Sequence, residues 1–333
     1  MHIELSHTLE HDSVVCCVRF SNDGRYIATG CNKTAVLYDA VTGNRIAMFS
    51  NEGVLETQVA LDNLTCGDSY VRSVCFSPDS KYLVAGAEDK TIKLWDIQGK
   101  RLRHSLYGHT KDIYSVDYSA DGLYVVSGSG DKRAKLWDVN TGTCVRTFGD
   151  EEGPKDGVTS VAVSPDSRYI AAGSLDRVVR LWDLKTGKLI EKFDGHNDSV
   201  YSVSFSPDAK LLASGSLDKT LKLWDLTSAG QGNPTGTKCR HTFQGHKDFV
   251  LSVVFAPQGT WLISGSKDRS VQFWDPRRLV AGGTLAAEEG PVLILQGHQN
   301  SVISVAHSPA ALLFATGSGD KRARIWRYQF EGS

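Results

Sequence analysis

Residues 195–225 have the sequence GHNDSVYSVSFSPDAKLLASGSLDKTLKLWD. Alternating polarity and β-branched or aromatic residues predict strands in three of its segments: VYSVSFS (200–206), LLASGS (211–216) and TLKLWD (220–225). Between the first two of these strands, SPDAK (206–210) predicts a tight turn, because proline fixes one backbone angle and aspartate favours the next turn position. A fourth predicted strand precedes the next Gly-His pair, in CRHTFQGH (239–246). The stretch therefore predicts a unit of four strands.

This unit recurs seven times along the chain. Each copy ends in Trp-Asp or a close variant: Tyr38-Asp39, Trp95-Asp96, Trp137-Asp138, Trp182-Asp183, Trp224-Asp225, Trp274-Asp275 and Trp326-Arg327. Several copies open with Gly-His: Gly108-His109, Gly195-His196, Gly245-His246 and Gly297-His298. A period of about 40 to 50 residues with these two signatures is typical of β-propeller blades. The sequence predicts an all-β, seven-bladed propeller that forms a single domain over residues 1–333.

The two ends of the chain predict how the ring closes. The last repeat stops at IWRYQF (325–330), after its third strand, whereas IELSHTLEH (3–11) is similar to the fourth-strand segments of other repeats. Residues 3–9 are therefore expected to be the fourth strand of the last blade, which removes exposed sheet edges. Three insertions interrupt the period: 50–69, which we expect to lie near the top of the second blade, 227–238 and 276–291.

Composition excludes several classes of function. The net charge is −1 and the pI is about 6.8, so no overall field attracts nucleic acid or membranes. The seven cysteines form no Cys-x-x-Cys pair and have no metal-ligand spacing, which favours a reducing compartment and no metal or other cofactor. The N-terminus has no signal-peptide pattern, and no run is long enough to span a membrane.

A His, Ser or Thr, Asp and Trp recur at intervals of 18, 4 and 6 residues in four repeats. The sets are His109, Ser127, Asp131 and Trp137; His196, Ser214, Asp218 and Trp224; His246, Ser264, Asp268 and Trp274; and His298, Thr316, Asp320 and Trp326. Such a set resembles a hydrolase triad, but repetition at fixed spacing indicates architecture, and no nucleophile elbow surrounds the serines. We predict a structural relay from Asp through His and Ser to the Trp indole, and no enzymatic activity.

The repeats that depart from this pattern support the structural interpretation. The second repeat has Gly67 and Ala85 at the His and Ser positions, and the fourth has Pro154 and Ala172. The histidine and the hydroxyl that would bond to it are absent together, so neither leaves an unsatisfied partner. The first repeat keeps the relay in altered form: His11, Thr29, Asn32 and Tyr38.

The whole chain resembles the WD-repeat family, and within it the C-terminal propeller of fungal Tup-type general transcriptional corepressors. The segments that carry the closer resemblance are HDSVVCCVRFSNDGRYIATGCNKTA (11–35), YVRSVCFSPD (70–79), GAEDK (86–90), DGVTSVAVSPDSRYIAAGSLDR (156–177), HKDFVLSV (246–253), SGSKDR (264–269) and QGHQNSVISVA (296–306). They include the repeats that lack Gly-His, so the resemblance is more specific than the generic repeat.

The resemblance implies a nuclear corepressor domain that binds no DNA itself and is recruited by sequence-specific DNA-binding repressors. The resemblance also suggests histone tails as a second class of partner. Members of this family bind a tetratricopeptide-repeat corepressor and assemble through an N-terminal segment that we do not find in this sequence, so the domain alone is expected to be monomeric. The alternative is a substrate receptor or scaffold of a ubiquitin-ligase or chromatin-modifying complex.

In propellers of this family the fourth-to-first and second-to-third strand connections share one face, called the top face here. Positions three and five beyond the His, and the position before the relay Asp, are expected to surround the channel mouth there. Aromatic and Arg side chains are the usual anchors of interfaces, with charged groups at the rim. The expected protein-binding residues are Cys16, Tyr70, Arg72, Glu88, Asp112, Tyr114, Tyr201, Leu217, Phe249, Leu251, Lys267 and Asn300.

Overall fold

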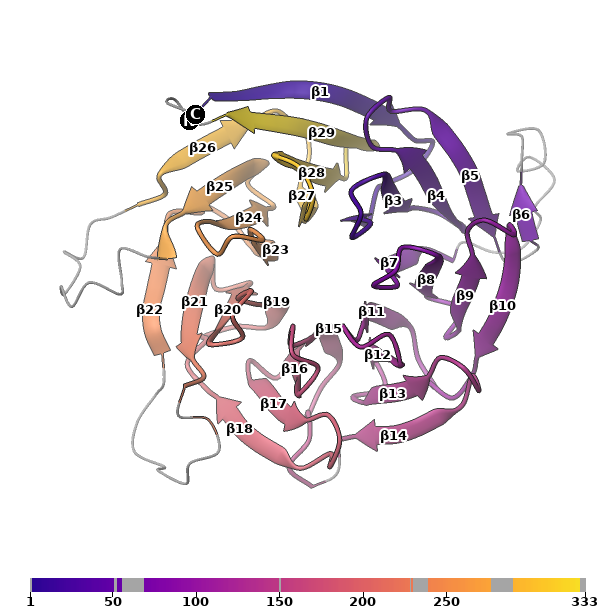
Figure 1. The fold of residues 1–333 in the computed structure, drawn as a ribbon. Helices are drawn as coiled ribbons and strands as arrows, with labels where there is room; N and C mark the ends of the chain where they lie inside the picture. The colour runs from indigo at the N-terminus through magenta and orange to yellow at the C-terminus, as the bar shows by residue number, and fades with distance from the viewer. Residues whose placement is uncertain are drawn as a thin grey trace.

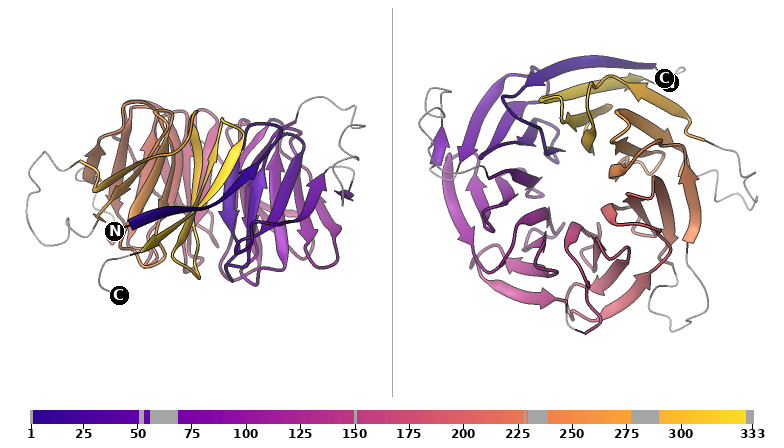
Figure 2. Two further views of the ribbon diagram at one scale, coloured as in Figure 1. Left: turned by 90° about the horizontal axis from the view of Figure 1, so that it is seen from above. Right: turned by 180° about the vertical axis from the view of Figure 1, so that it is seen from behind.

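The computed structural model describes residues 2–50, 53–55, 69–149, 151–227, 229, 239–276 and 290–329. Seven antiparallel sheets stand around a central channel like the blades of a propeller (Figure 1). The side view in Figure 2 shows that the blades lie in a single layer, and the view from behind shows the ring. The all-β, seven-bladed fold predicted from the sequence is confirmed. No helix among these described residues is long and apolar enough to cross a membrane.

The strands of each blade follow one another from the channel outward. Blade 1 contains β2 (Cys17–Phe20), β3 (Tyr26–Gly30), β4 (Thr34–Asp39), β5 (Arg45–Ser50) and β6 (Gly53–Leu55). Blade 2 contains β7 (Val71–Phe76), β8 (Tyr82–Ala87), β9 (Ile92–Asp96) and β10 (Arg101–Leu106). Blade 3 contains β11 (Ile113–Tyr118), β12 (Tyr124–Ser129), β13 (Ala134–Asp138) and β14 (Cys144–Phe148). Blade 4 contains β15 (Val158–Val163), β16 (Tyr169–Ser174), β17 (Val179–Asp183) and β18 (Leu189–Phe193).

The remaining blades have the same order. Blade 5 contains β19 (Val200–Phe205), β20 (Leu211–Ser216), β21 (Thr220–Asp225) and β22 (Cys239–Gln244). Blade 6 contains β23 (Val250–Phe255), β24 (Leu262–Ser266), β25 (Ser270–Trp274) and β26 (Leu293–Gln296). Blade 7 contains β27 (Val302–His307), β28 (Leu313–Ser318), β29 (Arg322–Gln329) and β1 (His2–Glu10).

The ring closes in blade 7, where the two ends of the chain meet (Figure 1). β1 pairs antiparallel with β29 over eight residue pairs, from His2 with Gln329 to Glu10 with Arg322. The predicted closure by an N-terminal strand is therefore present, and the strand is one residue longer at each end than 3–9. Of the three insertions, β6 is described between residues 50 and 69. Most of the rest of the 50–69 insertion, and almost all of 227–238 and 276–291, lie outside the described residues.

Hydrophobic cores form between neighbouring blades rather than within one sheet. Between blades 5 and 6, buried Leu221 and Leu223 pack with Val250 and Leu262 in one cluster. The Trp274 ring lies against Phe243, with centroids 5.3 Å apart. The same contact of a blade's tryptophan with the fourth strand of the blade before it recurs for Phe49 with Trp95, Phe148 with Trp182, and Phe193 with Trp224. The repeated tryptophan thus joins one blade to the next.

Close approach of neighbouring blades explains the recurring glycine of the second strand. A Cβ at Gly215 would lie 2.7 Å from Cγ1 of Val250 and 2.8 Å from Cγ1 of Val253, both in the next blade. Real Cβ atoms do not tolerate such contacts with a packed core, so a side chain at this position would force the blades apart.

A ring of serines also joins the blades, around the channel. The Oγ of each serine accepts a hydrogen bond from a backbone N–H in the first strand of a neighbouring blade, at 3.0–3.1 Å. The pairs, donor first, are Val18 to Ser304, Val116 to Ser73, Val161 to Ser115, Val203 to Ser160, Val253 to Ser202 and Val305 to Ser252. Cys17 occupies the seventh position. The recurring Ser-Val dipeptide is the signal in the sequence for this ring.

We expect Ser202→Ala to lower the free energy of unfolding by about 1–2 kcal/mol, because the buried Val253 N–H then loses its side-chain acceptor. Denaturant unfolding measures this change. Ser301→Ala, on the half-buried top-face Ser301, is the control and should stay within about 0.5 kcal/mol of the parent. Equal midpoints for the two variants would exclude a stabilising role for the ring.

Candidate binding site at the channel mouth

The two kinds of connection expected on the top face lie side by side in six blades. In each, the residue before the relay Asp position donates its N–H to the carbonyl of the residue three beyond the His position: Glu88 to Tyr70, Gly130 to Asp112, Leu175 to Gly157, Leu217 to Ser199, Lys267 to Phe249 and Gly319 to Ser301. The donor–acceptor distances are 2.9–3.1 Å. These bonds fix the height of both loops around the channel.

The channel forms a cavity of about 480 Å³ lined by the first strands of all seven blades. Five of the predicted binding residues line it: Cys16, Arg72, Tyr114, Tyr201 and Leu251. Thr159, Leu175 and Ile303 complete the mouth. We call these eight residues the rim site. Its volume is in the range of ligand pockets, and its upper wall combines aromatic, aliphatic and cationic groups.

Arg72 is held at the mouth by contacts within blade 2. Its Nε donates to Glu88 Oε1 at 2.7 Å, Nη2 donates to the same oxygen, and its guanidinium lies 5.4 Å from the Tyr70 ring centroid. The second oxygen of Glu88 accepts the Tyr70 N–H at 3.1 Å. Glu88 and Tyr70 therefore orient Arg72, and the Glu88 carboxylate offsets its charge.

Tyr114 lies close to two glycines. A Cβ at Gly130 would come within 3.2 Å of the Tyr114 hydroxyl, and one at Gly157 within 3.6 Å of its ring. Burial, with the nearby charge of Asp112, raises the pKa of the Tyr114 phenol. Tyr201, in blade 5, is 40% exposed and interacts electrostatically with both Tyr114 and Arg72. Residues of blades 2, 3 and 5 thus converge at one opening.

The other predicted residues do not line the cavity. Lys267 Nζ lies 4.7 Å from the Phe249 ring centroid and 3.9 Å from Asp248 Oδ2, so this pair forms a separate feature of blade 6. Asn300 accepts the Ser301 N–H at 2.7 Å. Asp112 and Leu217 take part in the backbone bonds between loops. Cys16 lines the cavity but is buried, and burial raises the pKa of its thiol, so it does not supply a reactive thiolate.

The four sets of His, Ser or Thr, Asp and Trp come together in hydrogen-bonded chains. In blade 5 the His196 Nδ1–H donates to Asp218 Oδ2 at 2.8 Å. The Trp224 indole N–H donates a hydrogen bond to Ser214 Oγ at 2.8 Å, and the Ser214 hydroxyl in turn donates one to His196 Nε2 at 2.7 Å. Blades 3, 6 and 7 have the same contacts at 2.7–2.9 Å.

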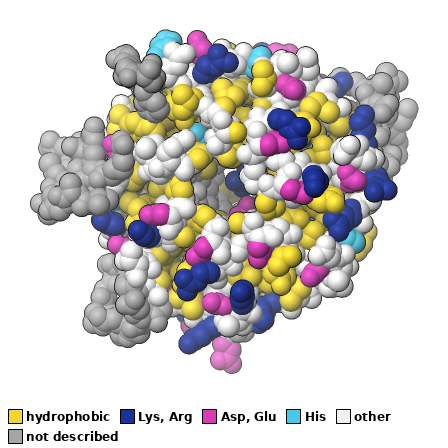
Figure 3. All heavy atoms as spheres, viewed as in Figure 1, with side chains coloured by type: hydrophobic (Ala, Val, Ile, Leu, Met, Phe, Trp, Pro, Cys, Tyr) yellow, Lys and Arg dark blue, Asp and Glu magenta, His cyan; other side chains and the backbone are white. Residues whose placement is uncertain are grey.

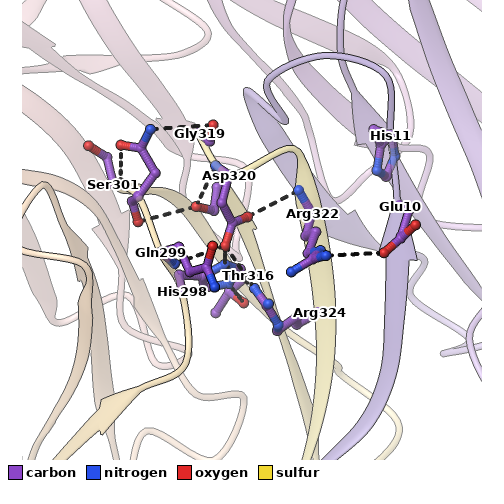
Figure 4. A network of polar contacts seen from close by, with 12 residues as sticks. Glu10, His11, His298, Gln299, Ser301, Thr316, Gly319, Asp320, Arg322 and Arg324 are labelled. Carbon is purple, nitrogen blue, oxygen red and sulfur yellow. Dashed lines mark hydrogen bonds and ion pairs between the residues drawn. The ribbon is translucent and has the colours of Figure 1, made fainter.

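Burial alone would raise the pKa of Asp218, but hydrogen bonds from His196 and Thr220 hold it below its usual range. In blade 7 the same balance places the pKa of Asp320 at about 2 (Figure 4). Figure 4 also shows Arg324 reaching Asp320, and Arg322 reaching Glu10 of β1 at 3.3 Å. The relay of blade 7 therefore adjoins the strand pair that closes the ring.

Blades 1 and 4 show how the structure compensates for departures from the relay. In blade 1, His11 Nε2 contacts Thr29 Oγ1 at 2.8 Å and the Tyr38 hydroxyl at 3.2 Å. In blade 4, buried Arg180 bonds to Asp176 at 2.9 Å in the absence of a histidine. Sequence analysis missed Arg180, although Arg324 of blade 7 stands at the same position before the tryptophan and bonds to Asp320 in the same way.

Two charged residues of the channel were also missed from the sequence. Arg19 and Asp117 line the cavity below the rim. Both residues lie within the first strands of their blades. Alternation along such a strand shows which residues share a face of the sheet, but it does not show whether that face borders the channel or a packed core. The signal in the sequence was their departure from the residues at the same position of the other repeats.

Comparison with protein families gives seven matches to "WD domain, G-beta repeat", at residues 3–39, 60–96, 100–138, 142–183, 187–225, 237–275 and 289–327. The first match begins within β1, the fourth strand of blade 7. Each sequence repeat therefore spans two blades. Because of this offset between repeat and blade, strands from both ends of the chain pair within blade 7.

The chain is similar to proteins named as transcriptional repressors. It is 54% identical to the transcriptional repressor rco-1 of Neurospora crassa over 98% of this chain and 52% of that protein. It is 59% identical to the general transcriptional corepressor tupA of Dictyostelium discoideum over 48% of this chain and 26% of that protein. Identity to the general transcriptional corepressor TUP1 of Saccharomyces cerevisiae is 44%, over 34% of this chain and 22% of that protein.

The chain thus spans about half the length of rco-1 and a smaller share of the other two. Its similarity to rco-1 extends over nearly all of its own length, including the blades without Gly-His. With seven matching repeats that build seven blades, the chain belongs to the WD domain, G-beta repeat family.

Proposed function

We propose that this chain is the interaction domain of a transcriptional corepressor, and that its rim site binds a short segment of a DNA-bound repressor in the nucleus. The observation that carries the proposal is the similarity to rco-1 over 98% of the chain. The rim site adds a physical basis, since exposed Tyr201 and Arg72 lie beside Tyr114 at one concave opening. A segment that becomes ordered on binding favours modest affinity and reversible recruitment.

We also propose that the domain is not catalytic. The hydroxyl-bearing relay residues Ser127, Ser214, Ser264 and Thr316 are each 0% exposed. A nucleophile must reach its substrate, and these hydroxyls already bond to an indole N–H and an imidazole. Their arrangement suits the satisfaction of buried polar groups.

Affinity capture from fungal nuclear extract tests the binding role. We expect Tyr114→Ala/Tyr201→Ala to reduce recovery of proteins with sequence-specific DNA-binding domains at least about thirtyfold, because two aromatic anchors that contribute at least about 1 kcal/mol each account together for about 2 kcal/mol. Mass spectrometry of the bound fraction gives the ratio. Tyr107→Ala is the matched control, since Tyr107 is 71% exposed and does not line the cavity.

Equal recovery by the double variant and the parent would place the binding site away from the rim. Recovery of ubiquitin-ligase subunits in place of DNA-binding repressors would favour the alternative scaffold role. The melting temperatures of both variants must match the parent for the comparison to hold.

A further inference from the structure

The lower part of the channel carries two charges at a position that is uncharged in the other five blades. Arg19 in β2 and Asp117 in β11 occupy the same position of their blades, counted from the ring serine or Cys17. At that position the other blades have Cys75, Ala162, Ser204, Val254 and Ala306. Asp117 and Ser204 each accept a backbone N–H of the next blade from this position, but a hydroxyl serves that bond as well, so the repeated architecture does not account for a charge here.

The two charges face the same cavity without pairing. Both line it, and each acts electrostatically on the Cys75 thiol between them and on the other. No ion pair of 4.0 Å or less joins them, and within the described part of the chain the Arg19 guanidinium has no hydrogen bond. Asp117 Oδ2 accepts the Val163 N–H at 2.8 Å. Burial raises the pKa of Asp117 in spite of Arg19 and the backbone donors.

This pair can be reached from the face opposite the rim site. It lies three residues along the first strands from the rim positions, which is about 10 Å. Figure 3 shows the face formed by the first-to-second and third-to-fourth strand turns, and that face is hollowed at its centre. Apolar Ala162, Val254 and Phe205 also line this cavity.

The charges select the class of ligand. A cation that approaches Asp117 meets Arg19, and an anion that approaches Arg19 meets Asp117. A neutral group that presents an acceptor and donors together satisfies both, because Arg offers only donors and a carboxylate only acceptors. A primary carboxamide is such a group: its oxygen accepts from Arg19 and its NH₂ donates to Asp117.

We propose that the channel floor, formed by Arg19 and Asp117, is a second binding site that accepts a primary carboxamide. The group belongs either to a Gln or Asn side chain of a partner or to a small free carboxamide. The site is separate from the rim site, and it does not depend on the corepressor role proposed above.

The test uses the domain with ¹³C-labelled valine methyl groups and three matched probes: propionamide, propionate and propylammonium. We expect propionamide to give saturable shifts of the channel-floor methyls of Val163 and Val254, with a Kd on the order of 10 mM for so small a ligand. Arg19→Met and Asp117→Asn should each weaken its binding at least tenfold. Tyr107→Phe, at an exposed residue that does not line the cavity, is the control and should leave the Kd unchanged.

Two arms separate the sources of the carboxamide. Acetyl-glutamine methylamide binding more tightly than propionamide assigns the site to a partner's side chain, and the reverse assigns it to a free small molecule. The proposal is overturned by tighter binding of propionate or propylammonium, by the absence of saturable shifts with propionamide, or by propionamide binding that survives both charge variants. The melting temperature and the methyl spectrum without probe verify that each variant is folded.

Discussion

Deletion of residues 1–10 is expected to lower the melting temperature by about 10 °C, since the free energy of unfolding falls by roughly 5 kcal/mol. The deletion removes the eight residue pairs between β1 and β29 and the burial of Leu9, which is 4% exposed. It also leaves β29 as a long unpaired edge, which favours association of the open rings. Differential scanning calorimetry measures the change in stability, and light scattering measures the association.

The matched control keeps β1 and alters only an outward side chain. Leu5→Ser changes a residue that is 49% exposed, so the free energy of unfolding should change by no more than about 0.5 kcal/mol. An unchanged melting temperature after the deletion would mean that blade 7 is stable with three strands and that the ring does not depend on closure.

His246→Ala is expected to lower the free energy of unfolding by about 1–3 kcal/mol, because it removes a partner from two buried groups at once. Ser264 loses the acceptor of its proton at 2.7 Å, and Asp268 loses a donor at 2.9 Å. Denaturant midpoints measure the loss. His7→Ala, which removes a single contact of 2.7 Å to the Val41 carbonyl, is the control and should cost less than about 1 kcal/mol.

The double variant His246→Ala/Ser264→Ala tests whether the relay acts as a unit. Each single change leaves a polar group unpaired, whereas the double change removes both members of that pair. We therefore expect the double variant to cost about 1 kcal/mol less than the sum of the two single changes. Blade 4, with Pro154 and Ala172 at these positions, is the natural counterpart. Strict additivity would contradict the relay.

The candidate site was only partly predictable, for reasons that differ from residue to residue. Tyr70, Arg72 and Glu88 occupy top-face positions that follow from the repeat, and they contact one another in the structure. Phe249 and Lys267 occupy equivalent positions, but they form a separate pair away from the cavity. Position in the repeat fixes the face and height of a side chain. Its rotamer and its distance from the channel depend on neighbours in other blades.

Local patterns in the sequence specify the strands, the blade number and the closure at the N-terminus, because a blade is a local unit whose alternation, turns and Trp-Asp ending recur within about 40 to 50 residues. They also specify which residues recur as relays. The closed ring is what brings single-copy residues to one cavity: Arg72 and Tyr201 at the mouth, and Arg19 and Asp117 below it. These residues lie in different blades, and their approach is set by the curvature of the closed ring, which no local pattern encodes.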